Sequence, residues 1–209
     1  MNEKKNTTTL FHLPASCSAA VHAALKITGA SFDVESVDLA SKSDAFVAAS
    51  PIGKVPALSD DQGTMFEGGA INLWLSQKFP ASQLMPDLKS LEGREALKWL
   101  FFCYGTLHPV WVRLFFPQRI AGEGDKEAVK ALATEDIIKN YKILSEALGD
   151  QKFMAGDSLT LADLYIAATF HWESGVNGEL TRRFPNMVAL KARVLTNPKV
   201  AEAFAGEIS

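Results

Sequence analysis

Strand-type and helix-type hydrophobic patterns alternate over the first 40 residues of the chain. Residues 7–13 combine threonine with leucine and phenylalanine, which is the β-branched and aromatic content of a strand. Apolar residues then recur at helical spacing over residues 17–27, and residues 32–39 alternate between apolar and polar positions. This order predicts a strand, a helix and a second strand.

A hairpin and another helix follow. Residues 55–58 form a short apolar strand, the turn signal Asp-Asp-Gln-Gly occupies residues 60–63, and residues 64–66 form the return strand. Because Pro56 has no N–H to donate to a sheet, its strand must begin near this residue or lie at an edge. A helical apolar period starts after Glu67. The N-terminal part of the chain therefore predicts a βαβ-ββα arrangement.

Strand signals vanish in the rest of the chain. Prolines interrupt the pattern after the last of these helices, and we place a linker over residues 81–91. Residues 92–116 predict one long helix, in which Pro109 should cause a bend because one i to i−4 hydrogen bond is lost. A further helix is predicted over residues 126–148. The fold class is therefore α/β followed by an all-helical part.

Thr160 and Asp163 carry a clear local signal in the second half. Their spacing approximates a capping box ahead of the apolar run that begins at Leu164. Capping contributes about 1 kcal/mol to stability, so we interpret this pair as structural.

Composition excludes several classes of function. The 209 residues are 47% hydrophobic and carry a formal net charge of −3 without a basic cluster, so no nucleic-acid surface is predicted. No apolar run approaches the roughly 18 to 20 residues of a membrane span. Residues 1–9 are polar, so no secretory signal is expected, and the two cysteines do not form a disulfide framework. These features favour the cytoplasm, and the spacing of His, Cys, Asp and Glu predicts no metal site.

Main-chain groups and one carboxylate come together around residues 55–68. Val55, ahead of a proline-initiated strand, keeps backbone groups that can pair with an extended peptide. Glu67 can hold an ammonium group, and the N–H groups at Gly68 and Gly69 can hold a carboxylate at the helix N-terminus. Such an arrangement suits a γ-glutamyl peptide. The alternative is an edge strand beside a solvated glutamate.

The same residues carry a family resemblance. The run Pro-Ile-Gly-Lys-Val-Pro-Ala-Leu at residues 51–58, with Glu67 and Gly68 after it, resembles the glutathione-binding half of cytosolic glutathione transferases. The resemblance implies a cis bond before Pro56, a backbone pairing between Val55 and the cysteinyl part of glutathione, and a thioredoxin-like first domain. Many members have Ser where this chain has Gly68, so the carboxylate contact would fall to the backbone N–H.

Further implications concern the whole chain. The resemblance divides it into a thioredoxin-like domain at residues 1–80, a linker at 81–91 and an all-helical domain at 92–209. Lys42 is similar to a lysine that reaches the glycine carboxylate of glutathione, although on sequence alone it is a surface lysine. Family members are usually homodimers.

Cys17 is the first catalytic candidate. At the start of a helix its thiolate would be stabilised by N–H groups and the helix dipole. The run Pro14-Ala15-Ser16-Cys17-Ser18 also resembles the active-site turn of the bacterial beta class. A buried packing role is the alternative for Cys17, and Ser18 is then the alternative hydroxyl donor.

His108 is the second candidate. It shares a helix face with Tyr104 and Trp111, where a lone histidine is more often a core residue. The resemblance implies that it faces the sulfur site. This chain departs from the family pattern at Phe101 and Pro109, where polar glutathione contacts are missing.

Four residues are predicted to wall an apolar second-substrate pocket. They are Leu13, Tyr104, Trp111 and Phe115. Core packing is the alternative for each of them.

The resemblance thus implies a glutathione transferase that activates the thiol of glutathione for conjugation to an electrophile, a detoxification chemistry. A reactive Cys17 would also suit thiol transfer or peroxide reduction through a mixed disulfide. The competing hypothesis is a transferase-shaped module that binds glutathione or a protein without turnover. No metal is expected among the cofactors.

Overall fold

The computed structural model describes residues 8–208. Residues 1–7, which include most of the polar N-terminal stretch and the predicted first strand residue Thr7, lie outside the described part. The strands are β1 (Thr8–His12), β2 (Phe32–Ser36), β3 (Ala57–Asp60) and β4 (Gly63–Phe66). The helices of the first half are α1 (Ser18–Thr28), α2 (Asp44–Ala49), α3 (Gly68–Lys78) and the 3₁₀ turn η1 (Pro80–Ser82). Those of the second half are α4 (Leu91–Phe101), the π-helix η2 (Phe102–Leu107), α5 (His108–Phe115), α6 (Gln118–Ala121), α7 (Lys126–Leu148), α8 (Leu161–Phe170), the 3₁₀ turn η3 (His171–Val176), α9 (Glu179–Arg183), α10 (Pro185–Val194) and α11 (Pro198–Phe204).

The four strands form one mixed sheet in the order β2-β1-β3-β4. β1 is parallel to β2 and antiparallel to β3, so Leu10 lies between Val34 and Leu58. Because successive side chains of a strand point to opposite faces, Leu10 and Leu58 join the main core, whereas Phe11 and Ala57 join a second, smaller core.

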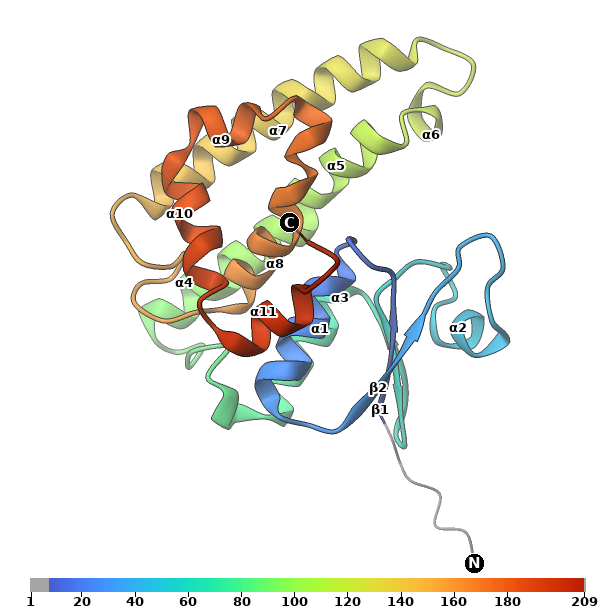
Figure 1. The fold of residues 1–209 in the computed structure, drawn as a ribbon, viewed down its shortest axis with the longest axis vertical. Helices are drawn as coiled ribbons and strands as arrows, with labels where there is room; N and C mark the ends of the chain where they lie inside the picture. Colours follow the sequence, from blue (N-terminus) through green and yellow to red (C-terminus); the bar gives the residue numbers. More distant parts are fainter. Residues whose placement is uncertain (1–7, 209) are drawn as a thin grey trace, which may run out of the picture.

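The two faces of the sheet carry different helices (Figure 1). α2 covers the face of the smaller core through Phe46 and Ala49. α1 and α3 cover the other face, and α1 also contacts α8 and α11 from the second half. The predicted α/β part followed by an all-helical part is confirmed.

Three local predictions need correction. The second strand ends at Ser36 instead of residue 39, and the connection to β3, which the sequence left without structure, contains α2. This short helix is capped by the Ser43 hydroxyl, which accepts from the Phe46 N–H. β3 is not an edge strand, since it pairs with β1 and β4. The free main chain lies just before it, at Val55.

The predicted long helix of the second half forms as three consecutive segments, α4, η2 and α5, and α7 packs along α5 (Figure 1). Pro109 cannot donate to the carbonyl four residues earlier, at Gly105. The chain adopts the wider π turn directly before it, over Phe102–Leu107. The expected bend is therefore a change of helical register that precedes His108.

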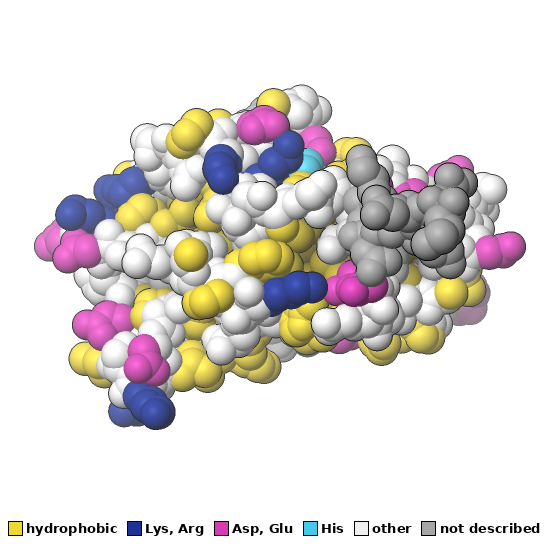
Figure 2. All heavy atoms as spheres, turned by 90° about the horizontal axis from the view of Figure 1, so that it is seen from below, with side chains coloured by type: hydrophobic (Ala, Val, Ile, Leu, Met, Phe, Trp, Pro, Cys, Tyr) yellow, Lys and Arg dark blue, Asp and Glu magenta, His cyan; other side chains and the backbone are white. Residues whose placement is uncertain are grey.

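The surface carries both signs of charge. Figure 2 shows Lys and Arg interspersed with Asp and Glu over the face that it presents, with apolar side chains between them. Within residues 8–208, no helix has the length and apolar character needed to cross a bilayer.

The capping interaction at α8 is confirmed, and it is stronger than a simple cap. The fully buried Asp163 carboxylate accepts from the N–H and the hydroxyl of Thr160, at 2.8 and 2.7 Å. It also accepts from the Met154 N–H at 2.8 Å, which fixes the loop before the helix. Burial raises the pKa of this carboxyl to about 6, against the opposing effect of these hydrogen bonds.

We predict that Asp163→Ala lowers the free energy of unfolding by about 3 kcal/mol, because three buried donors lose their acceptor. Asp163→Asn keeps one acceptor oxygen and should lose less. Urea unfolding followed by circular dichroism measures both. The control is Asp157→Ala, whose exposed side chain pairs with Lys152 only at the surface. Equal stability of the Asp163→Ala variant and the wild type would contradict the structural role.

Candidate active site

The Val55–Pro56 peptide bond is cis, as the resemblance implied. The preceding loop is fixed by Ser50, whose hydroxyl donates to the Lys54 carbonyl at 2.7 Å and accepts from the Lys54 N–H at 3.1 Å. The Val55 carbonyl accepts the Cys17 thiol at 3.6 Å. Val55 lies outside the helices and strands, and no backbone carbonyl among residues 8–208 accepts a hydrogen bond from its N–H. A short run of main chain is thus available for pairing beside a thiol.

The N-terminus of α3 lies against this run. Glu67 is the residue before the helix, is exposed, and has a left-handed φ of 72°. Non-glycine residues in this conformation are uncommon and cluster at functional sites. A Cβ atom at Gly68 would lie 2.7 Å from Cε1 of Tyr104 and 3.1 Å from Cγ of Pro56. Glycine at this position therefore lets Tyr104 and the proline ring pack on the helix N-terminus.

Tyr104 connects this N-terminus to the second half of the chain. Its hydroxyl accepts from the Asn72 side chain at 3.0 Å, and its ring centroid is 4.7 Å from that of Tyr165. Asn72 and Tyr165 are both buried. Tyr104 is half-buried, so it can both support α3 and face a ligand.

Cys17 directly precedes α1 and is buried. Burial raises the pKa of Cys17 to about 12, which favours the thiol over the predicted thiolate in the protein without ligand. The hydrogen bond from the Cys17 backbone N–H and the charge of Lys54 lower the pKa of this thiol, whereas the charge of Glu67 raises it. The helix N-terminus favours the thiolate, as expected, but desolvation has the larger effect.

Ser18 does not face the sulfur site. Its buried hydroxyl hydrogen-bonds to His12 Nδ1 and to the Ser16 hydroxyl, both at 2.7 Å. The same oxygen contacts both backbone groups of Leu13, at 3.1 and 3.2 Å. These partners use the capacity of one hydroxyl, so Ser18 holds the turn and the alternative role as a sulfur donor finds no support.

His108 begins α5 and is half-buried. Its Nδ1 is hydrogen-bonded to the Tyr165 hydroxyl at 2.8 Å, and its ring lies 5.9 Å from that of Trp172. Burial, with a smaller effect of the Lys54 charge, lowers the pKa of His108 to about 4. The imidazole is therefore neutral at pH 7.

Trp172 and His171 are contacts that the sequence analysis missed. The Trp172 Nε1 and the His171 Nε2 both donate to the Ala15 carbonyl, at 2.8 and 3.1 Å. Ala15 has a left-handed φ of 59°, so these bonds fix an unusual backbone turn two residues before Cys17. No sequence signal links Ala15 to these two residues, which follow it by 156 and 157 positions.

The remaining predicted residues divide into two groups. Lys42 is exposed and its Nζ lies over Gly53, on the loop that leads to Val55. Leu13 is half-buried and Phe115 exposed, so both are accessible to a ligand. Trp111 is fully buried and stacks on Phe115 with ring centroids 5.7 Å apart. The prediction that Trp111 walls a pocket is therefore wrong: it supports Phe115 from the core.

Comparisons with known proteins agree with this geometry. Residues 6–77 match a family model described as the N-terminal domain of glutathione S-transferase, and residues 106–206 match one described as its C-terminal domain. The chain is 31% identical over 203 residues to the glutathione S-transferase GstA of Escherichia coli O157:H7, with 95% of this chain and 98% of that protein covered.

Two solved structures extend the comparison. A bacterial beta class glutathione S-transferase of Sphingomonas chungbukensis is 33% identical, with a TM-score of 0.83, and covers 95% of this chain and 98% of its own. A sphingomonad glutathione S-transferase complexed with glutathione has the same identity and coverage and a TM-score of 0.82.

The close packing at Gly68 yields a stability prediction. We expect Gly68→Ala to lower the free energy of unfolding by about 2 kcal/mol, because the new methyl group collides with Tyr104 and Pro56. Adding Tyr104→Ala to this variant should recover part of the loss. The control is Gly105→Ala, where a Cβ would meet no atom within 4 Å. Chemical denaturation of these three variants and of the single variant Tyr104→Ala tests this, and additive losses in the double variant would contradict it.

The raised pKa of Cys17 yields a reactivity prediction. Since the thiolate is the reactive form, the alkylation rate of Cys17 by iodoacetamide should rise steadily from about pH 6 to about pH 10 without a plateau. Peptide mass spectrometry separates Cys17 from Cys103, which is also buried and has a raised pKa. Free glutathione in the same reaction is the reference for an ordinary thiol. A plateau near neutral pH would show that Cys17 is a thiolate in the unliganded protein.

Proposed function

Since the chain belongs to the glutathione S-transferase family, we propose that it binds glutathione along Val55 and activates the thiol of this tripeptide for attack on an electrophile. The observation that carries the proposal is the position of the Val55 carbonyl. It faces Cys17 at 3.6 Å, next to the N-terminus of α3 and the carboxylate of Glu67.

Three groups of this chain match the three parts of glutathione. The backbone of Val55 pairs with the cysteinyl amide, as an added strand would. Glu67 binds the α-ammonium group of the γ-glutamyl end, and the N–H groups at the start of α3 bind its α-carboxylate. Lys42, over Gly53 on the same loop, pairs with the glycine carboxylate.

Binding would change the hydrogen bond of Cys17. The cysteinyl N–H of glutathione takes the Val55 carbonyl, which releases the Cys17 thiol from its present acceptor. With its pKa raised to about 12, Cys17 remains protonated, so the released S–H donates to the sulfur of glutathione. A hydrogen bond to a thiolate stabilises it and lowers the pKa of the bound glutathione thiol.

His108 acts from the other side of the sulfur. Its neutral ring accepts a hydrogen bond from the thiol of glutathione, and the proton then leaves to water, since an imidazole of such low pKa holds it weakly. The glutathione thiolate forms a carbon–sulfur bond with the electrophile, and the leaving group departs with the electron pair of the broken bond. Leu13, Tyr104 and Phe115 line the side from which an apolar electrophile approaches.

Thiol transfer to a disulfide substrate is a second reaction of the same site. The glutathione thiolate, held beside the Cys17 thiol, attacks one sulfur of the disulfide and forms a mixed disulfide with it, while the other sulfur leaves as a thiolate. Both cysteines are free in the structure, which agrees with a reducing cytoplasm.

We also propose the division into residues 1–80, 81–91 and 92–209, and assembly as a homodimer. Light scattering tests the assembly through a mass twice that of the 22.7 kDa chain.

The test of the function combines binding and turnover. Calorimetry with glutathione should show one site per chain, and an aryl halide should be conjugated in its presence.

We predict that Glu67→Gln raises the Kd for glutathione about tenfold or more, because a charge-assisted hydrogen bond of about 1.5 kcal/mol is lost. Exposed Glu92 on α4 provides the control, Glu92→Gln, which should bind as the wild type does.

Two results would oppose the proposal. Absence of glutathione binding would remove it, and binding without conjugation or disulfide reduction would favour the non-catalytic module. An unchanged Kd in Glu67→Gln would contradict the position of the γ-glutamyl end while leaving the reaction itself in place.

A further inference from the structure

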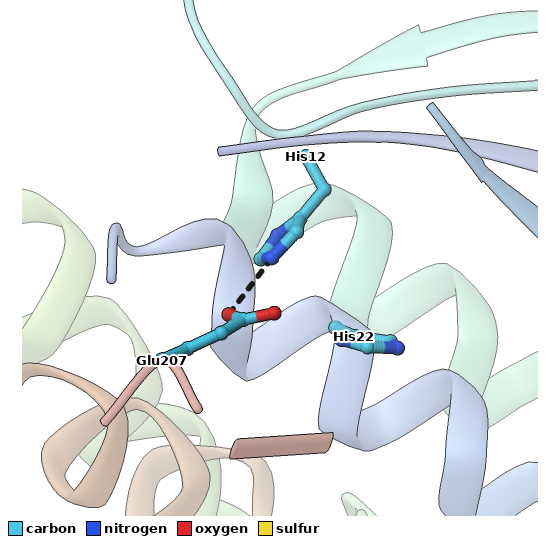
Figure 3. Close-up of side chains that lie close together, drawn as sticks. All are labelled: His12, His22 and Glu207. Atoms are coloured by element: carbon cyan, nitrogen blue, oxygen red, sulfur yellow. Dashed lines mark hydrogen bonds and ion pairs between the residues drawn. The ribbon is translucent and has the colours of Figure 1, made fainter. Parts of the chain in front are cut away.

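Three polar side chains from distant parts of the chain lie close together (Figure 3). His12 ends β1, His22 lies on α1, and Glu207 follows α11 near the C-terminus. One ring nitrogen of each histidine and one carboxylate oxygen all lie within 4.8 Å of one another. His12 Nε2 and Glu207 Oε2 are hydrogen-bonded at 2.9 Å. The sequence could not reveal this cluster, since His12 and Glu207 are 195 positions apart.

The His12 ring is oriented as a metal-binding imidazole usually is. Its Nδ1 is hydrogen-bonded to the Ser18 hydroxyl at 2.7 Å, which leaves Nε2 directed at Glu207 (Figure 3). Metal-binding histidines commonly have such a partner on the second ring nitrogen, because it fixes the tautomer and the orientation of the ring. Ser18 is itself held by both backbone groups of Leu13, so this support is rigid.

His22 contributes a nitrogen that has no use in the fold. Its Nδ1 is buried without a hydrogen-bond partner, which is costly for a polar atom. Burial is the main cause of a lowered pKa for this imidazole, and the neighbouring His12 lowers the pKa further. The buried Nδ1 therefore lacks the partner that a metal ion would supply.

A cleft adjoins the cluster at His22. It has a volume of about 390 Å³, lies between the end of α1, β2 and α11, and has His22 in its wall. Lys26 and Glu202 also line the cleft and pair with each other at 2.7 Å, so Glu202 is already engaged. Of the three clustered residues, His22 is the one that borders this cleft.

We propose that His12 Nε2, His22 Nδ1 and a carboxylate oxygen of Glu207 form a binding site for Zn²⁺ or a similar divalent transition-metal ion. Two imidazoles and one carboxylate are a donor set that zinc uses, with water as the fourth ligand. Tetrahedral coordination with bonds of about 2.0–2.1 Å places ligand atoms roughly 3.4 Å apart. The present separations, from 2.9 Å to at most 4.8 Å, reach this value through small side-chain movements.

The ion would join three separate segments of the chain. It would bind the end of β1, the middle of α1 and the segment after α11 to one centre, and so hold the C-terminus against the first half. Because these ligands are brought together only in the folded protein, the ion stabilises the native state. The proposal does not rest on the glutathione reaction, and its test needs no substrate.

Zn²⁺ alone, added to the full chain without glutathione, is the probe. Calorimetry should show one Zn²⁺ per chain, and saturating Zn²⁺ should raise the Tm. His22→Ala and Glu207→Gln should each weaken binding at least about tenfold and abolish the rise in Tm. The matched control is Glu202→Gln, a nearby carboxylate on α11 that pairs with Lys26 and should leave Zn²⁺ binding unchanged.

Co²⁺ provides a readout that does not depend on the variants. The wild-type protein should give the intense visible bands of tetrahedral Co²⁺ without a sulfur-to-metal charge-transfer band, since neither Cys17 nor Cys103 is among the ligands. Absence of stoichiometric Zn²⁺ binding, equal binding in His22→Ala, or a thiolate band with Co²⁺ would each overturn the proposal.

Discussion

The packing of α1 between the sheet and the C-terminal helices is the contact on which the rest of the structure depends. Seven of its eleven residues are buried, more than one helix face can supply, so the helix is covered on opposite sides. Four of the seven are alanines, whose small side chains let α3 approach from one side and α8 and α11 from the other. The N-terminus of α1, with Cys17, is thereby fixed at the boundary between the two halves.

Burial at this boundary also explains the charge state of the site. Desolvation dominates at both Cys17 and His108, where it keeps the thiol protonated and the imidazole neutral. The charges of Lys54 and Glu67 act on these groups from the periphery with smaller effects. The site therefore carries little charge at its centre, and a bound thiol is the group that can become ionised there. Donors that remain protonated are suited to stabilise such an anion.

The sequence predicted what depends on local pattern and failed where distant segments meet. Strand and helix periods located most elements, and the motif around Val55 and Glu67 pointed to the main chain that we propose as the binding site. Both signals lie within a few consecutive residues. The short helix α2 was missed, since six residues carry too weak a period. Trp172 was missed because its bond to Ala15 exists only after the chain has folded. Burial of Cys17 stood only as an alternative in the sequence, since it arises from the layers that cover α1.

The turn that presents Cys17 is held from the C-terminal half at two places. His171 and Trp172 fix the Ala15 carbonyl on one side of the cysteine. On the other side, Ser18 is hydrogen-bonded to His12, which in turn pairs with Glu207.

Neither half of the chain can therefore complete the site alone. The first half supplies the main chain on which we propose that the peptide docks, while the second half sets the backbone geometry at the Cys17 sulfur and provides His108. Hydrogen bonds to backbone and buried side chains require fixed separations, so a small shift of the helical half would alter both supports of the turn at once. The position of Cys17 is consequently a property of the interface between the halves, and the motif around Val55 is only one part of what defines the proposed reaction centre.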